Sequence, residues 1–536
     1  MGFSGSNSKE NAGAKRAIGG DLAKVLPYQP RSWIFTPHLL KLNLVILVPL
    51  LSQSSCGYDG TMMNGLQTLP QWHDYFNNPS AALLGLLNAC VPIACILSFA
   101  PVAWLSDKYG RKFSITAGLL SIFVGSALQA GAVNVGMFIG ARFILGISAA
   151  LISQPSPLLV TELAYPPHRA KVTTLYNTFY YLGSVIAAWA TYATFTRDST
   201  WAWRIPSLLQ IAIPSFQLCF LWWVPESPRW LVANGRVEDA RAVLTKYHGN
   251  GDENSELVAF EMLEIQETLR LEKEAAHQNV WRDMIATKAN RKRTYISIWI
   301  GVTGQWLGVG VVFYYLYLVL NSAGITSVKD QTLINGGLTL WNWLWSIAGA
   351  LMVDRIGRRT LYLTSLSGML VSYIIWTVLT SRFAATSSTP LGYVVVAMIF
   401  IFYVFYDVGA LVLFQAYTVE IWPYRYRSNG LALVYITAYA SLIVNLFVNP
   451  IALERIGWKY YIIYCCLISI ALVGVYYMFP ETRGYSLEEI ARVFEGEGAH
   501  VPDGSMVLDE VHHIVASDEK AGKVDITVVN VEDISS

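Results

Sequence analysis

Two short charged segments of the chain, LSDKYGRK (105–112) and MVDRIGRR (352–359), repeat one pattern. Each follows a long apolar run, and a second repeated pattern comes two apolar runs later, as TELAYPPHR (161–169) and VEIWPYRYR (419–427). Two matching motifs at matching places indicate an internal duplication. We therefore predict two related halves that face each other across a central cavity.

Apolar runs of the length that crosses a bilayer recur along the chain. They lie near 40–62, 83–105, 113–132, 137–160, 171–194, 205–224, 295–320, 331–353, 360–380, 391–419, 430–450 and 459–479. The composition points the same way, because 54% of the residues are hydrophobic and only 14% are charged, against about 25% charged in soluble domains. The sequence predicts an all-α membrane protein with twelve transmembrane helices in two six-helix halves.

The chain divides into five predicted parts. They are a cytosolic N-terminal tail (1–39), an N-terminal six-helix half (40–224), a cytosolic helical linker (225–294), a C-terminal six-helix half (295–480) and a partly disordered cytosolic tail (481–536). The linker is helix-prone, but its many charged residues mean that it cannot span a bilayer. The orientation follows from the short loops, since Lys and Arg concentrate on the side that carries the repeated motifs, and such loops face the cytosol.

The repeated motifs predict a gate at the cytosolic face. They place opposite charges at the ends of neighbouring helices, where a network of ion pairs can lock one conformation and release it when the halves rock. A static brace is the alternative. The predicted gate residues are Asp107, Arg111, Glu162, Arg169, Asp354, Arg358, Glu420 and Arg427.

Charged residues also occur within the spans, where an ionised group at mid-bilayer costs about 2.5–3.5 kcal/mol on insertion scales. Asp59 in the first span and Arg142 in the fourth could meet in the cavity of the first half. Pairing would keep Asp59 ionised and separation would favour its protonation, which is the chemistry of a proton-coupled carrier. A static salt bridge is the alternative. Asp407, in the tenth span, either contacts a substrate or is a structural polar group.

The ordered set of motifs resembles the sugar porter family of the major facilitator superfamily, from about Leu40 to Glu489. The motifs are GYDG (57–60), DKYGRK (107–112), GARFILG (140–146), ELAYPPHR (162–169), PESPRW (225–230), DRIGRR (354–359), EIWPYRYR (420–427) and PETRG (480–484). Two stretches, 175–189 and 445–461, are similar to the fungal lactose permease and cellodextrin transporter branch. The resemblance implies the major facilitator fold, and the proton-coupled members carry an acid and an arginine at the positions of Asp59 and Arg142.

The resemblance also implies substrate contacts in the cavity, where amides donate and accept hydrogen bonds and aromatic rings cover sugar C–H faces. With Asp407 added, the predicted substrate-binding residues are Asn177, Gln305, Tyr314, Tyr315, Asn342, Asp407, Gln415 and Asn445. Hydrogen bonding between helices is the alternative role of each amide. Gly304 and Gly310 replace family amides, and Gln415 replaces the tryptophan of many hexose porters. These exchanges are expected to open space for a disaccharide.

The sequence thus predicts a proton-coupled sugar symporter of the plasma membrane that works by alternating access. The expected substrate is a disaccharide or short oligosaccharide of the lactose or cellobiose type, and the expected partners are the sugar, protons and membrane lipid, with the carrier a monomer. Two alternatives remain: a sugar sensor with little flux and a cytosolic signalling partner, and a carrier of a non-sugar metabolite. Since no catalytic or metal-ligand spacing occurs, we expect no enzyme activity, cofactor or metal, and no nucleic-acid partner.

Overall fold

The computed structural model describes residues 36–275, 280–386, 389–422, 424–482 and 494, and these ranges contain helices and turns without a strand. The predicted tails, 1–39 and 481–536, lie largely outside the described residues. The side chains of two predicted site residues, Asp354 and Gln415, also lie outside the described part. The all-helical prediction is confirmed for the described ranges.

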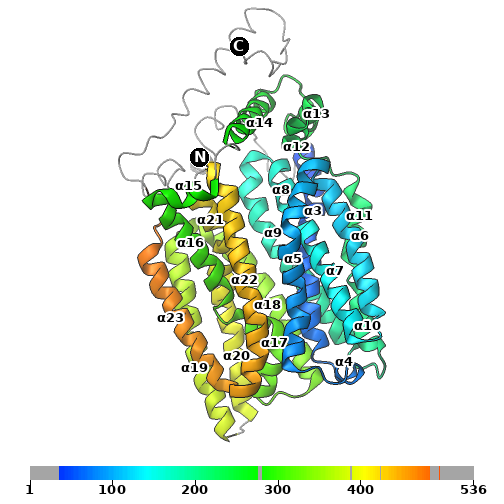
Figure 1. Cartoon of the computed structure of the whole chain (residues 1–536), viewed down its shortest axis with the longest axis vertical. Coiled ribbons are helices and arrows are strands. Elements are labelled where there is room, and N and C mark those ends of the chain that lie inside the picture. The colour runs from blue at the N-terminus through cyan, green and yellow to red at the C-terminus, as the bar shows by residue number, and fades with distance from the viewer. Residues whose placement is uncertain (1–35, 276–279, 387–388, 423, 483–493, 495–536) are drawn as a thin grey trace, which may run out of the picture.

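The N-terminal half forms the blue-to-cyan side of the molecule (Figure 1). A short helix, α4 (Pro70–Tyr75), lies at the end far from the linker, and the turn η2 (Pro166–His168) precedes α9. The six predicted spans correspond to α3 (Pro37–Leu66), α5 (Ala81–Tyr109), α6 (Arg111–Ala130), α7 (Val135–Ser153) with α8 (Pro155–Leu163), α9 (Arg169–Thr194), and α10 (Trp201–Leu209) with α11 (Ala212–Leu221).

The C-terminal half forms the yellow-to-orange side (Figure 1). Its spans correspond to α16 (Lys288–Gln305) with α17 (Val309–Ser322), α18 (Val328–Ile356), α19 (Arg358–Thr386), α20 (Thr389–Phe405) with η3 (Tyr406–Ala410) and α21 (Leu411–Ile421), α22 (Tyr424–Ile456), and η4 (Gly457–Lys459) with α23 (Tyr460–Met478). The helix α16 begins inside the predicted linker, because the Thr287 side chain accepts a hydrogen bond from the Asn290 amide and caps the helix there.

Nine helical segments of the described residues are long and apolar enough to cross a membrane. The helices α9 and α18 are not among them, although both lie where the fifth and eighth spans are predicted. These two helices pack against each other between the halves. A helix that faces protein rather than lipid keeps polar residues, which lowers its mean hydropathy without changing its place in the fold.

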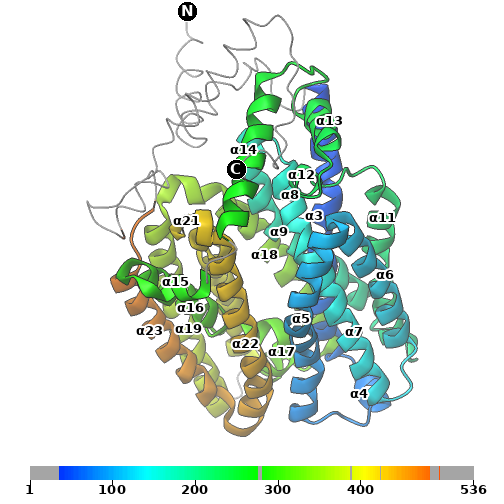
Figure 2. The same ribbon diagram turned by 45° about the horizontal axis from the view of Figure 1, so that its top comes forward.

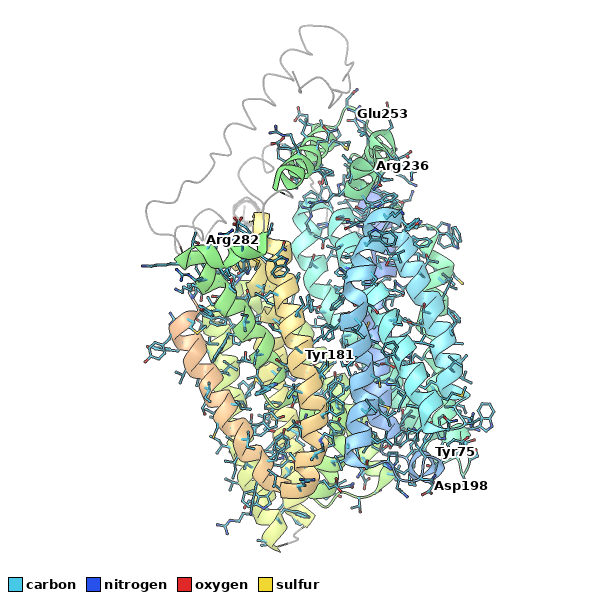
Figure 3. The ribbon with its side chains drawn as sticks, viewed as in Figure 1. Tyr75, Tyr181, Asp198, Arg236, Glu253 and Arg282 are labelled. Atoms are coloured by element: carbon cyan, nitrogen blue, oxygen red, sulfur yellow. The ribbon has the colours of Figure 1, made fainter. Side chains whose placement is uncertain are left out.

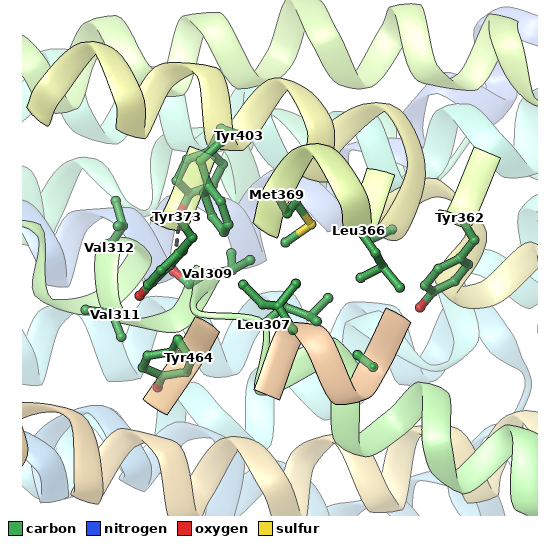
Figure 4. Packing of buried hydrophobic residues seen from close by; sticks show 14 of the residues in the cluster. Leu307, Val309, Val311, Val312, Tyr362, Leu366, Met369, Tyr373, Tyr403 and Tyr464 are labelled. Carbon is green, nitrogen blue, oxygen red and sulfur yellow. Dashed lines mark hydrogen bonds between the residues drawn. The ribbon is translucent and has the colours of Figure 1, made fainter. Parts of the chain in front are cut away.

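The seventh span is broken at Gly308, which has a left-handed backbone with φ of +85°. A Cβ atom at this position would lie 2.5 Å from the ring of Tyr373, so both the turn and the close approach require glycine. Aromatic rings of α19, α20 and α23 surround the break (Figure 4). The Tyr403 hydroxyl donates to the Val309 carbonyl at 3.2 Å. The break in the seventh span is therefore buried and tightly packed in the core of the C-terminal half.

The linker contains α12 (Pro228–Ala233), α13 (Val237–Tyr247), α14 (Glu256–Ala275) and α15 (Val280–Ala286). The first three helices cover one end of the N-terminal half, and α15 lies beside the C-terminal half (Figure 2). Buried His248 anchors the linker, with Nδ1 at 2.7 Å from the Glu261 carboxylate and Nε2 at 3.2 Å from the Leu163 carbonyl. Tyr165 packs edge-on against this imidazole, and burial raises the pKa of Tyr165 to about 12, so its phenol stays neutral.

Candidate functional site

A small polar cavity lies between the two halves. It leaves about 20 Å³ for the centres of water molecules, enough for one or a few waters but far below the roughly 300–1,000 Å³ of ligand pockets. In the described conformation, this site therefore has no room for a sugar. Tyr181, on the cavity wall, lies about midway along the molecule (Figure 3). The lining residues are Thr61, Asn64, Tyr181, Val312, Phe313, Asn335, Leu338, Thr339, Asn342 and Tyr403.

Asn342 is the predicted substrate-binding residue that the structure places on the cavity wall. Its side chain is buried, and its Oδ1 atom has no hydrogen-bond partner among the described residues. A buried acceptor without a partner costs about 1–3 kcal/mol. A hydroxyl-bearing ligand or a water in the cavity would satisfy it.

Other predicted substrate-binding side chains form hydrogen bonds with protein groups in this conformation. The Asn445 amide donates to the Gln305 carbonyl at 2.7 Å and accepts from Tyr464, so it joins α22 to the broken seventh span. Tyr315 is buried, and its hydroxyl donates to the Leu446 carbonyl. Asn177 lies half-buried on α9 and has a partner of its own. For Asn445 the geometry matches the alternative of hydrogen bonding between helices.

The expected widening at two glycines is not present in this conformation. A Cβ atom on Gly304 would lie 3.1 Å from the Phe414 ring, and one on Gly310 would lie 3.0 Å from the Asn445 amide. Neighbouring side chains therefore occupy the space that the family amides would take. The expected space for a disaccharide therefore stays a prediction, because the sequence shows which atoms are missing but not how neighbouring side chains pack.

Hydrogen bonds join the halves between the cavity and the outer ends of α3 and α17. Asn64 accepts from the Leu316 amide at 3.2 Å and lies 3.5 Å from the Asn335 side chain. The Gln67 amide donates to the Tyr314 carbonyl at 3.3 Å. These bonds tie the two halves together beside the cavity. Sequence reasoning missed Asn64, Gln67 and Asn335, although amides within apolar spans are a usable signal.

The structure brings Asp59 and Arg142 together in the first half. A guanidinium nitrogen of Arg142 lies 2.6 Å from Asp59 Oδ1, and the two side chains are 3% and 13% exposed. Gln210 donates to the same carboxylate oxygen at 3.1 Å, and Arg142 Nε donates to the Leu87 carbonyl. Arg142 is buried and Asp59 is largely so, and each has a further hydrogen bond besides the ion pair, which offsets part of the cost of removing the charges from water.

Asp407 lies behind the cavity wall rather than on it. It is completely buried in the π-helical turn η3, and Tyr181 donates a hydrogen bond to its Oδ1 atom at 2.6 Å. Single π-helical turns inside α-helices occur frequently at functional sites. This contact joins the two halves at the cavity, and the sequence could not show it because the two residues are far apart in the chain.

Residues of the predicted gate form a network at the end of the N-terminal half that adjoins the linker. Arg111 lies 2.9 Å from Asp107 and 3.7 Å from Glu162. The Glu226 carboxylate accepts hydrogen bonds from the amides of Arg111 and Lys112 and so caps α6. Arg169 begins α9 at the same end.

The C-terminal half repeats this arrangement. Arg358 lies 2.9 Å from Glu420, and the Glu481 carboxylate accepts from the amides of Arg358 and Arg359. Arg427 lies in the first turn of α22 at the same end. The internal repeat thus extends to the Pro-Glu dipeptides at 225–226 and 480–481, which follow the sixth and twelfth spans. Sequence reasoning quoted both dipeptides but missed the capping role of their glutamates.

Together, the fold and the site define a membrane carrier built from two helical halves with a small polar cavity between them. A family model described as "Sugar (and other) transporter" matches residues 45–494. The chain belongs to this family of carriers.

Several curated proteins are similar over most of their length. The MFS-type transporter oryC of Aspergillus oryzae is 28% identical over 83% of this chain and 84% of its own. The high-affinity glucose transporter of Kluyveromyces lactis is 27% identical over 88% of each chain. The probable polyol transporter 6 of Arabidopsis thaliana is 25% identical over 83% of this chain and 92% of its own.

Solved structures show the same fold. The inward-open xylose transporter XylE of Escherichia coli matches with a TM-score of 0.70 and 22% identity, over 85% of this chain and 100% of that one. The proton:xylose symporter XylE bound to 6-bromo-6-deoxy-D-glucose matches with a TM-score of 0.69. The predicted twelve-helix major facilitator fold is confirmed.

Proposed function

We propose that the chain is a proton-coupled sugar symporter that works by alternating access, as a monomer in the plasma membrane. The observation that carries the proposal is the buried Asp59–Arg142 pair in the half that supplies one wall of the polar cavity. Protonation of Asp59 would remove the charge that holds Arg142. Proton binding in the first half and sugar binding between the halves would then favour the same rearrangement.

The cavity chemistry favours a neutral polyhydroxylated substrate. Its polar lining consists of hydroxyls and amides from both halves, which accept and donate hydrogen bonds without carrying charge. Phe313 and Tyr403 add aromatic surface. Relatives named as glucose and polyol transporters fit this class of substrate.

Within this class we propose a disaccharide or short oligosaccharide of the lactose or cellobiose type. The support is the similarity of 175–189 and 445–461 to the fungal lactose permease and cellodextrin branch. The glycines at 304 and 310 add no support, because Phe414 and Asn445 occupy the adjacent space in this conformation.

Uptake of labelled sugars by a yeast strain without its own sugar carriers tests the proposal. The panel contains lactose, cellobiose, glucose, xylose and a sugar acid, each measured with and without an uncoupler at equal surface expression. Accumulation that the uncoupler abolishes supports symport. Binding without uptake identifies a sugar sensor, and uptake of the acid alone identifies a carrier of another metabolite; either result contradicts the proposal.

A further inference from the structure

The structure contains a second buried acid, which lies outside the Asp59–Arg142 pair. Asp407 is 0% exposed, and its Oδ1 atom accepts one hydrogen bond, from Tyr181. Its Oδ2 atom has no hydrogen-bond partner among the described residues. Asp59, by contrast, has Arg142 and Gln210 as donors. The two acids therefore sit in opposite electrostatic surroundings.

The groups around Asp407 supply no counter-charge within the described part of the chain. Tyr181 of α9, Tyr403 of α20 and Tyr406 of η3 face it, and all three are phenols. The neighbouring helices α19 and α21 carry Arg358 and Glu420, which pair with each other. An ionised Asp407 would thus be a buried charge with one hydrogen bond.

Close packing keeps Asp407 away from water in this conformation. A Cβ atom on Gly349 of α18 would lie 2.8 Å from the Asp407 carbonyl oxygen, and one on Gly409 would lie 2.4 Å from the Ser365 side chain. The turn η3 is therefore held tightly between α18 and α19. Removing a carboxylate from water without a counter-charge costs several kcal/mol, and such a group takes up a proton instead.

The contact with Tyr181 links this acid to the transport cycle. Tyr181 belongs to the N-terminal half and Asp407 to the C-terminal half, and Tyr181 also lines the cavity. Separation of the halves would break this hydrogen bond and expose the carboxyl group to water, and closure would remove it from water again.

We propose that Asp407 is a second proton-binding site of the carrier, loaded when Tyr181 of the opposite half closes over it. The proton adds to Oδ2 while Oδ1 keeps the hydrogen bond from Tyr181, and it leaves to water when the halves separate. This proposal rests on the proposed proton-coupled function. It places one proton-binding acid in each half.

Difference infrared spectroscopy on the purified full-length carrier tests the proposal without measuring transport. The C=O stretch of a protonated carboxylic acid is recorded across a pH titration for wild type, Asp407→Asn and Asp59→Asn. We expect one acid band to be absent in Asp407→Asn and present in Asp59→Asn. An unchanged set of acid bands in Asp407→Asn overturns the proposal, even if the carrier proves to be a symporter.

Tyr181→Phe serves as the folding control, since it keeps Asp407 and removes only the hydroxyl. This variant should retain the acid band, and a loss of the band would contradict the assignment to Asp407. Sugar exchange in the Asp59→Asn background gives a second measurement. We expect exchange to depend on pH, falling up to about tenfold per pH unit once the proton leaves, and to lose this dependence in Asp59→Asn/Asp407→Asn. An identical pH dependence in both variants overturns the proposal.

Discussion

Replacing Asp59 by asparagine removes a negative charge beside Arg142 with almost no change in size. Arg142 is then left buried, with its Nε bond to the Leu87 carbonyl but without its carboxylate. Breaking a buried pair in this way costs about 3–5 kcal/mol. One proton that moves down a gradient of about one pH unit and about 100 mV releases about 3.7 kcal/mol. The two energies are similar, so one proton can drive separation of the pair.

Liposomes that contain the Asp59→Asn carrier should therefore lose the share of coupling that Asp59 supplies and keep exchange. Under that driving force, the proton carried by Asp59 could by itself support an accumulation of up to about 500-fold. The variant should lose this share, and Asp59→Asn/Asp407→Asn should equilibrate sugar at a ratio of about one. Labelled-sugar accumulation and counterflow are measured on the same liposomes, with equal amounts of protein.

The double variant Asp59→Asn/Arg142→Gln provides the energetic control. It removes the unpaired charge, so thermal stability in detergent should recover toward wild type while accumulation stays at the level of Asp59→Asn. Wild-type accumulation in Asp59→Asn would refute the role of Asp59. Failure of the double variant to recover stability would refute the attribution of the loss to a buried charge.

Three further predictions concern packing. Gly110→Ala should lower thermal stability in detergent, because the backbone φ is +103° and the new Cβ atom would lie 2.4 Å from the Glu226 carboxylate that caps α6. The control variant Gly140→Ala should not lower thermal stability, since no atom lies within 4 Å of its Cβ position. Gly349→Ala should reduce sugar transport, since its Cβ atom would lie 2.7 Å from the backbone of η3. The control variant Gly337→Ala, on the same helix, should not reduce transport, because its Cβ atom makes only an ordinary contact at 3.8 Å. Glu261→Ala should weaken linker docking by about 1–3 kcal/mol, because it leaves a buried imidazole nitrogen without its partner; the loss is measured as faster proteolysis of the linker.

For each of these three predictions, one experimental result would contradict it. Equal stability of the two variants at Gly110 and Gly140 would show that the cap tolerates a side chain. Equal transport by the variants at Gly349 and Gly337 would show that η3 can move away from α18. A proteolysis rate unchanged from wild type would show that His248 and Glu261 do not hold the linker.

Much of the fold could be predicted from sequence because its determinants are local. A spanning helix needs a long apolar run, and orientation follows from basic loops. The helices α9 and α18 have lower mean hydropathy than the others, yet the runs 171–194 and 331–353 were still recognisable. The capping role of Glu226 could not be predicted in the same way, because this cap depends on a contact between two segments that are far apart in the chain.

The sequence by itself determined the twelve spans, the duplication and the likeness to sugar porters, since periodicity, composition and motif order are properties of the chain. It also indicated Asp59 and Arg142 as charges that need a partner. Only the tertiary structure decided that these two residues pair, that Asn445 is committed to α16, and that Asp407 lies behind Tyr181 at the contact between the halves. The physical reason is that the setting of a buried polar group depends on the atoms that surround it, and most of those atoms come from other helices.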